Sequence, residues 1–202
     1  MIDLILDDCM NVMSKYEDNH FDLAIVDPPY GLDSKSMQGS GKLKHRILNT
    51  SDTSWDIAPK KEYFDELFRV SQNQIIWGGN YFINHLKSTR CFLIWDKKQF
   101  MPTFSACEFA WTSFYKPAKI FTQRGDFDKI HPTQKPVELY NWILHNYAEK
   151  GQKILDTHLG SGSIAVACYY FGVDLVGVEI DEEYYNKAKH RINELTRQKA
   201  LW

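Results

Sequence analysis

Short apolar runs rich in Ile, Leu and Val alternate along the chain with longer segments of helical pattern. The runs that predict strands are Asp3–Leu6, Leu23–Val26, Gln74–Trp77, Phe92–Trp95, Glu108–Thr112, Lys153–Leu155 and Leu175–Val178. The segments that predict helices are Lys61–Val70, Pro136–Tyr147, Ile164–Phe171 and Glu182–Arg197. Apolar strands separated by helices are typical of parallel sheets that are covered on both faces. The pattern therefore predicts an α/β fold with a doubly wound, mainly parallel sheet and helices on both faces.

The length of 202 residues favours a single domain, 1–202, with one sizeable core. The segment 32–59 interrupts the pattern, because it is polar, contains Gly39-Ser40-Gly41 and has no clean period. A loop of this length in a compact domain is usually functional or disordered. The alternative interpretation is a tolerated surface insertion, and the pattern leaves both open.

Composition alone does not indicate a nucleic-acid partner, because the net charge is −2 and the pI is near 6.4. The basic residues are clustered, however, at Lys35, Lys42, Lys44, His45 and Arg46 and again at Lys97, Lys98, Lys116, Lys119 and Arg124. A neutral protein can carry one positive face. Charge alone is equally compatible with a mixed, solvated surface.

The four cysteines form no C-x-x-C pair, which favours reduced thiols over a metal or redox site. The acidic N-terminal segment does not resemble a signal peptide, and no apolar run approaches a membrane span in length. We therefore expect a cytoplasmic protein with no bound metal and no membrane partner.

Two predicted strands end in residues suited to chemistry. The strand at 153–155 leads through Asp156 into Gly160-Ser161-Gly162 and then into a helix, so backbone N–H groups would face a ligand there. Glu179 ends the next strand about twenty residues later, the spacing at which a carboxylate accepts ribose hydroxyls. These features favour a cofactor that contains a nucleoside. The alternatives are a purely geometric glycine turn and a helix-capping role for Glu179.

The strand at 23–26 ends in Asp27-Pro28-Pro29-Tyr30. Prolines cannot continue a central strand, and Pro28 restricts Asp27 to an extended shape. The tetrapeptide therefore predicts a fixed carboxylate, a fixed carbonyl and an aromatic ring at one strand end.

Three motifs together resemble the amino-methylating DNA methyltransferases, which act on adenine N6 or cytosine N4. Asp27-Pro28-Pro29-Tyr30 matches the catalytic pattern (D/N/S)-P-P-(Y/F/W), and 131–136 matches H-P-T-x-K-P. The glycine loop resembles D-P-F-x-G-S-G-T but departs from it at Thr157, His158 and Ser163. The catalytic motif precedes the glycine loop, which is the order of the permuted β class. The similarity covers most of the chain, with looser matches at 32–59 and 99–124.

The resemblance implies a Rossmann-like fold and S-adenosylmethionine as cofactor. It implies a base site formed by Asp27, Pro28, Pro29 and Tyr30. It also implies a cofactor site formed by Asp8, Cys9, His131, Thr133, Lys135, Asp156, His158, Gly160, Ser161, Gly162 and Glu179. The substrate would be double-stranded DNA, with the loop 32–59 holding it in the absence of a separate recognition domain. Related small enzymes commonly dimerise, and some are paired with a restriction endonuclease.

The chemistry fits these residues, because an exocyclic amine must become more tetrahedral before it attacks a sulfonium methyl group. The Asp27 carboxylate and the Pro28 carbonyl can accept its two N–H groups. Such an amine is inaccessible inside a duplex, so the base must be flipped out and would stack on Tyr30. The Asp form of the motif favours adenine N6. The alternatives are cytosine N4, a catalytically weak DNA-binding subunit, the same chemistry on RNA or a protein glutamine, and a nicotinamide-dependent oxidoreductase.

Overall fold

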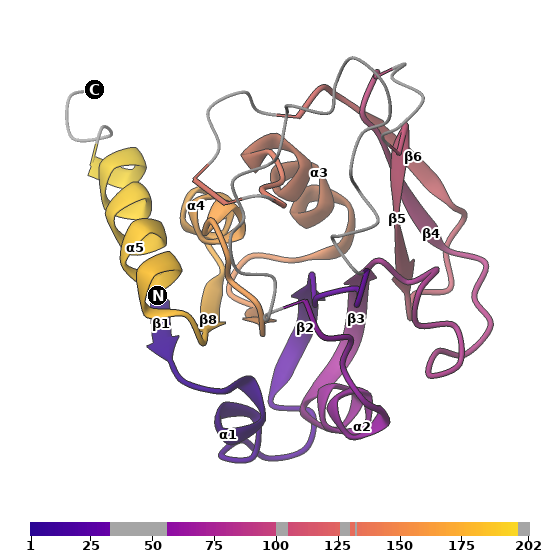
Figure 1. Cartoon of the computed structure of the whole chain (residues 1–202), viewed down its shortest axis with the longest axis horizontal. Coiled ribbons are helices and arrows are strands. Elements are labelled where there is room, and N and C mark those ends of the chain that lie inside the picture. The colour runs from indigo at the N-terminus through magenta and orange to yellow at the C-terminus, as the bar shows by residue number, and fades with distance from the viewer. Residues whose placement is uncertain (33–55, 100–104, 126–129, 132, 198–202) are drawn as a thin grey trace.

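The computed structural model describes residues 1–32, 56–99, 105–125, 130–131 and 133–197 (Figure 1). The basic residues Lys42, Lys44, His45 and Arg46 lie outside the described residues. The elements follow in the order β1 (Ile2–Leu6), α1 (Cys9–Met13), β2 (Phe21–Val26), α2 (Lys61–Val70), β3 (Ser71–Trp77), β4 (Phe92–Asp96), β5 (Cys107–Thr112), β6 (Lys119–Thr122), α3 (Val137–Tyr147), β7 (Lys153–Asp156), α4 (Ser163–Phe171), β8 (Asp174–Glu179) and α5 (Glu182–Arg197).

All eight strands belong to one sheet with the order β1-β8-β7-β2-β3-β5-β4-β6. Strand β5 runs antiparallel to both of its neighbours, and every other pair is parallel. The predicted α/β fold with a mainly parallel sheet is therefore confirmed. Every strand and helix predicted from the pattern is present, with ends that differ by at most three residues.

Two elements were not predicted. Helix α1 has five residues. Strand β6 has four residues, of which all but Phe121 are exposed. Both are too short to show a period of 3.6 or of 2. They form through tertiary contacts and a cap, since the Asp8 carboxylate accepts the Met10 N–H at 2.7 Å and starts α1.

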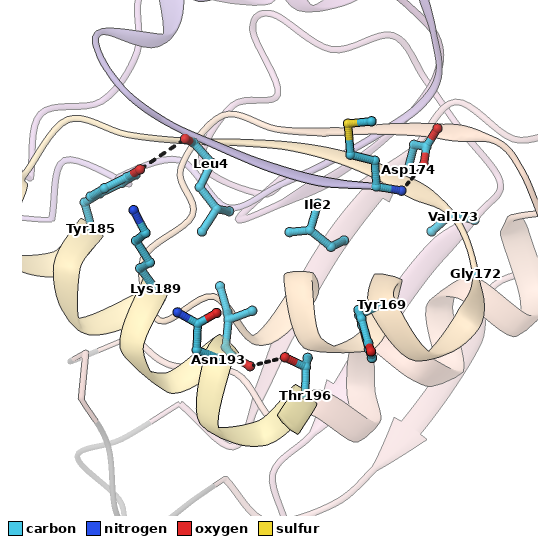
Figure 2. Close-up of a pocket in the computed structure, with 12 residues that line it drawn as sticks. Ile2, Leu4, Tyr169, Gly172, Val173, Asp174, Tyr185, Lys189, Asn193 and Thr196 are labelled. Atoms are coloured by element: carbon cyan, nitrogen blue, oxygen red, sulfur yellow. Dashed lines mark hydrogen bonds and ion pairs between the residues drawn. The ribbon is translucent and has the colours of Figure 1, made fainter. Parts of the chain in front are cut away.

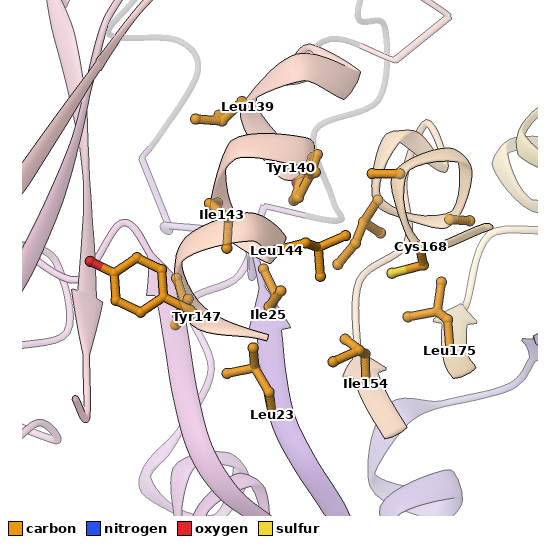
Figure 3. Close-up of a cluster of buried hydrophobic side chains, with 14 of the residues drawn as sticks. Leu23, Ile25, Leu139, Tyr140, Ile143, Leu144, Tyr147, Ile154, Cys168 and Leu175 are labelled. Atoms are coloured by element: carbon orange, nitrogen blue, oxygen red, sulfur yellow. The ribbon is translucent and has the colours of Figure 1, made fainter. Parts of the chain in front are cut away.

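Apolar side chains fill both faces of the sheet. On one face Leu23, Ile25, Ile154 and Leu175 pack with α3 and α4 (Figure 3). On the other face the alternate residues, such as Ala24, Val26 and Leu155, pack with α1 and α2. Full burial of one such Leu or Ile side chain stabilises the fold by roughly 1.5–3 kcal/mol. Helices on both faces explain why these strands are apolar throughout.

The strand order places the two predicted ligand sites side by side. Strand β7 pairs with β2, with Leu23 opposite Ile154 and Ala24 opposite Leu155. From this pair the chain proceeds outward in opposite directions, from β2 to β3 and from β7 to β8. Such a switch point is where doubly wound sheets bind ligands, at the carboxyl ends of the strands. Asp27 and Asp156 occupy these two strand ends.

None of the helices described by the structure is long and apolar enough to cross a membrane.

Candidate active site

The Asp27 carboxylate lies directly after β2 and has a partner on each oxygen. Oδ1 accepts the hydroxyl of Tyr30 at 2.6 Å, and Oδ2 forms an ion pair with the ammonium of Lys135. The side chain of Asp27 is 14% exposed, so it reaches the surface at this strand end. Asp27 is thus held in one orientation by two groups that lie outside β2.

The Tyr30 side chain donates a hydrogen bond to Asp27 through its hydroxyl, and its ring stacks on a second tyrosine. Its ring centroid lies 4.9 Å from that of Tyr81, with an angle of 22° between the planes. Burial, followed by the charge of Asp27, raises the pKa of Tyr30 well above its usual range. The hydroxyl therefore stays protonated and donates a hydrogen bond to the carboxylate. Tyr81 is 47% exposed. The two rings therefore present an aromatic surface beside the acceptor carboxylate.

The glycine loop joins β7 to α4. Gly160 and Gly162 have φ values of 52° and 71°, in the left-handed region that side chains disfavour. A Cβ atom on Gly162 would lie 2.7 Å from Ile192 Cδ1, so this glycine also lets α5 pack closely. The carbonyl of Ser161 accepts the Arg191 guanidinium at 2.9 Å, which ties the loop to α5. Helix α5 thus holds the loop in place, and the loop conformation requires glycine at positions 160 and 162.

Glu179 ends β8 beside this loop and accepts three backbone N–H groups. Oε2 accepts Gly160 at 2.8 Å, and Oε1 accepts Ile180 and Asp181, each at 3.0 Å. A carboxylate offers about four acceptor positions, so one remains for a hydroxyl. Burial raises the pKa of Glu179, although the three backbone N–H groups oppose this shift. Glu179 thus stabilises the turn that precedes α5 and bonds to the glycine loop, and its contact with a ribose stays a prediction.

A cavity of about 310 Å³ lies on the α1 and α2 side of the loop. Its lining includes Asp8, Cys9, Tyr63 and His158, together with Met10, Ile57, Pro59, Lys60 and Glu62. The volume is at the lower end of the range of small-molecule sites. Three residues of the predicted cofactor set, Asp8, Cys9 and His158, therefore share one cavity.

Two of the three departures from the family's loop pattern, Thr157 and His158, have hydrogen-bond partners of their own. Thr157 Oγ1 lies 2.7 Å from the hydroxyl of Tyr63 and 2.9 Å from Nδ1 of His158. Burial lowers the pKa of His158 to about 4, so its imidazole is neutral near pH 7. The backbone N–H of His158 donates to Asp156 Oδ1 at 3.1 Å. Burial, the largest effect, raises the pKa of Asp156 to about 8.

The motif at 131–136 divides between the two sites, with Pro132 outside the described residues. The His131 ring lies over the glycine loop, 3.6 Å from the position of a Cβ on Gly160 and 4.4 Å from the ring of Tyr184. Its Nδ1 lies 3.1 Å from Thr133 Oγ1. Lys135, predicted to contact the cofactor, directs its ammonium to Asp27 and Glu108. The structure thus places Lys135 beside the base site.

Three further residues join the site without a motif. Glu108 and Lys97 continue the ion-pair network of Lys135, and Tyr63 bonds to Thr157. Glu108 lies in a mainly apolar strand, and this is the one signal that the sequence offers for it. Lys97 appeared in the sequence only as part of a basic cluster. Its pairing depends on β4 and β5 lying side by side, which the pattern does not specify.

A second cavity, of about 700 Å³, lies between β1, α4 and α5 (Figure 2). Its lining includes Leu4, Tyr169, Tyr185, Lys189 and Asn193. None of the predicted site residues lines it. We therefore assign the candidate active site to the strand ends and not to this cavity.

The fold and the site define a Rossmann-like protein with an acceptor carboxylate and a glycine loop at one switch point. A family model described as DNA methylase, and named for N6 and N4 methyltransferases, matches residues 74–190. The chain therefore belongs to this DNA methylase family. The prediction of an amino-methylating DNA methyltransferase is confirmed at the level of the family.

Individual relatives agree with this assignment. The Type II methyltransferase M2.MboI of Moraxella bovis is 24% identical over 239 residues, which cover 93% of this chain and 86% of that protein. The crystal structure of the M1.HpyAVI–SAM complex has a TM-score of 0.65 and 19% identity, covering 95% of this chain and 100% of the other. The PvuII DNA methyltransferase, described as cytosine-N4-specific, has a TM-score of 0.65 and 10% identity, covering 98% and 92%. The structural likeness confirms the Rossmann-like methyltransferase fold.

Proposed function

We propose that this chain transfers a methyl group from S-adenosylmethionine to the exocyclic amine of a flipped base in double-stranded DNA, with adenine N6 as the target. One observation carries the proposal. The Asp27 carboxylate, which would accept hydrogen bonds from the amine, and the glycine loop that begins at Asp156 lie at the ends of two paired parallel strands, at the switch point of the sheet. A methyl donor and a methyl acceptor held at these two ends would lie next to each other.

The residues beside the glycine loop fit S-adenosylmethionine. Glu179 has one acceptor position left for a ribose hydroxyl, and Asp8 borders the cavity of about 310 Å³ in which an adenine ring would lie. A Cβ on Gly160 would meet no atom closer than 3.6 Å, and the nearest atoms belong to the His131 ring. When bound, this cofactor supplies an electrophilic sulfonium methyl group. The solved M1.HpyAVI complex with SAM, which shares the fold, supports this choice of cofactor.

The base site fits an exocyclic amine. Such an amine carries two N–H groups, and Asp27 Oδ1 and the Pro28 carbonyl offer two acceptors on a rigid segment. Acceptance of both N–H groups localises the lone pair on nitrogen and stabilises the positive charge that develops there during methyl transfer. Tyr30 and Tyr81 provide the aromatic surface on which the flipped base would stack. The Tyr30 hydroxyl takes one of the two acceptor positions of Oδ1, which leaves the second for the amine.

Adenine is preferred to cytosine because of the Asp form of the tetrapeptide. Cytosine N4 is the second candidate, favoured by the similarity to the cytosine-N4-specific PvuII enzyme. A catalytically weak subunit is less well supported, since Thr157 and His158 have hydrogen-bond partners and the loop around them retains both left-handed glycines.

Methylation of mixed-sequence duplex DNA with labelled S-adenosylmethionine, followed by nucleoside analysis, tests the proposal. We expect label in N6-methyladenine. Label only in N4-methylcytosine would transfer the assignment to the second candidate, and the absence of label from both nucleosides would refute the proposed function.

A further inference from the structure

Four charged side chains alternate in sign from the catalytic strand to the edge of the site. Asp27 pairs with Lys135, Lys135 also contacts Glu108 with Nζ 3.1 Å from Oε2, and Glu108 pairs with Lys97. Lys135 is 2% exposed and Glu108 is 23% exposed. A buried ammonium needs more than one acceptor to offset its loss of hydration. The pair of carboxylates meets this need.

The ammonium of Lys135 is confined on three sides. Asp27 and Glu108 attract it, and the indole ring of Trp77 lies beneath it, with Nζ 5.1 Å from the ring centroid. Burial tends to raise the pKa of Glu108, but the charges of Lys135 and Lys97 outweigh it and hold this pKa at about 2. Glu108 is therefore ionised throughout the neutral range. It attracts Lys135 as a full charge, with Oε2 3.1 Å from the ammonium nitrogen.

We propose that Glu108 is a positioning residue for methyl transfer, which acts by dividing the attraction of Lys135 between two carboxylates. This inference rests on the proposed function. With Glu108 present, Lys135 takes one oxygen of Asp27 and leaves Oδ1 directed toward the position of the target amine. Without it, Asp27 is the only charged partner of Lys135 among the described residues, and the ammonium competes with the amine for both oxygens of Asp27.

Glu108 acts from outside every recognised motif. It lies on β5 opposite Trp95 of β4, and Lys97, two residues beyond Trp95, closes the network. Strand β5 runs antiparallel between β3 and β4. The antiparallel strand thus contributes a residue to a site whose acceptor carboxylate, Asp27, follows a parallel strand.

The test is Glu108→Gln, which keeps the shape of the side chain and removes its charge. We expect kcat to fall about 10- to 100-fold, the usual scale for misplacement of a reacting group. The Kd for S-adenosylmethionine and the KM for DNA should stay within about twofold, because Glu108 contacts neither the cofactor nor the DNA in our assignment. The control is Glu194→Gln on α5, whose carboxylate pairs with the exposed His190 and should leave kcat unchanged.

A double-mutant cycle separates positioning from general destabilisation. In a Lys135→Met background, Glu108→Gln should cost little further activity, since Glu108 acts through Lys135. An equal loss of kcat in both backgrounds, or an unchanged kcat in Glu108→Gln alone, would overturn the inference. If the Gln variant does not fold, Glu108→Asp replaces it, because withdrawal of the charge by one methylene should lower kcat at constant KM. An inactive wild type would instead count against the proposed function.

Discussion

Asp27 and Lys135 are 108 residues apart in sequence, and their side chains form an ion pair at the carboxyl end of β2. This pair joins the tetrapeptide at 27–30 to the motif at 131–136, so two segments that resemble separate family motifs build one site. Because Lys135 is almost fully buried, loss of Asp27 leaves its ammonium with Glu108 as the one remaining carboxylate among the described residues, and we expect this to lower the free energy of unfolding. Variants at Asp27 must therefore be compared at measured stability.

The glycine loop predicts a specific loss of cofactor affinity. Gly160→Val places a β-branched residue at a φ of 52° and directs two methyl groups into the space beside His131. We expect the Kd for S-adenosylmethionine, measured by calorimetry, to rise about tenfold or more, equivalent to roughly 1.4 kcal/mol.

The matched control is Gly151→Val. Gly151 has a φ of 83° and nothing within 4 Å of a Cβ, in the turn that precedes β7. It bears a similar backbone strain far from the loop's ligand side and should bind the cofactor normally. Equal affinities in the two folded variants would reduce Gly160 to a structural role.

The stacking of Tyr30 on Tyr81 predicts that the ring and the hydroxyl of Tyr30 affect activity to different extents. Tyr30→Phe keeps the contact with Tyr81 and releases Asp27 Oδ1, so its kcat/KM on DNA should stay close to that of the wild type. Tyr30→Ala removes a stacking contact worth roughly 1–3 kcal/mol, and kcat/KM should fall about fivefold to one-hundredfold. Tyr169→Ala, on α4 beside the second cavity, is the control. Wild-type kinetics in the Ala variant would exclude base stacking on this ring.

The fold was predictable from sequence because its central strands are buried on both faces and their helices carry clear apolar periods. Strand β6 was missed since Lys119, Ile120 and Thr122 are exposed and give no alternation. At the site, Asp27, Gly160 and Glu179 were found from their positions after strands. Glu108 was not, because its role depends on the position of β5 beside β3, and strand order is set by long-range packing.

Asp156 predicts a pH dependence of stability. Burial raises its pKa from 3.8 to about 8, so the folded protein retains a proton that the unfolded chain loses. Between roughly pH 4 and pH 8 the unfolded state binds fewer protons from this group, and the free energy of unfolding falls as pH rises. His158 acts in the opposite sense below pH 6.5, because its pKa falls to about 4 on burial.

The informative range is therefore about pH 7.5 to 8, where His158 is almost entirely neutral in both states. Asp156→Asn carries no titrating group, so its stability should decline less than that of the wild type across this range. Urea denaturation at several pH values measures the difference. Parallel curves for the two proteins would show that Asp156 does not retain the proton.

The basic residues of the loop predict a salt-dependent contact with DNA. Neutralisation of Lys42, Lys44 and Arg46 together should raise the Kd for DNA and reduce the slope of log Kd against log salt by about one for each lost phosphate contact. Affinity for S-adenosylmethionine should not change. We expect Lys98, from the second basic cluster of the sequence, to support this contact, and Lys97 from the same cluster is a weaker candidate because it pairs with Glu108. The same slope in mutant and wild type would remove the loop from the DNA-binding surface.

The central claim is that Asp27 is the acceptor for the target amine and belongs to a site distinct from the cofactor loop. Asp27→Ala removes both acceptor oxygens, whereas Asn, which the pattern (D/N/S)-P-P-(Y/F/W) also allows, would keep one of them. With labelled S-adenosylmethionine and duplex DNA, we predict a loss of methyl transfer of at least about 100-fold, the usual effect of removing a key transition-state contact. Calorimetry on the same variant should give wild-type affinity for S-adenosylmethionine. Methyl transfer within about twofold of wild type, far below that usual effect, would contradict the assignment of Asp27.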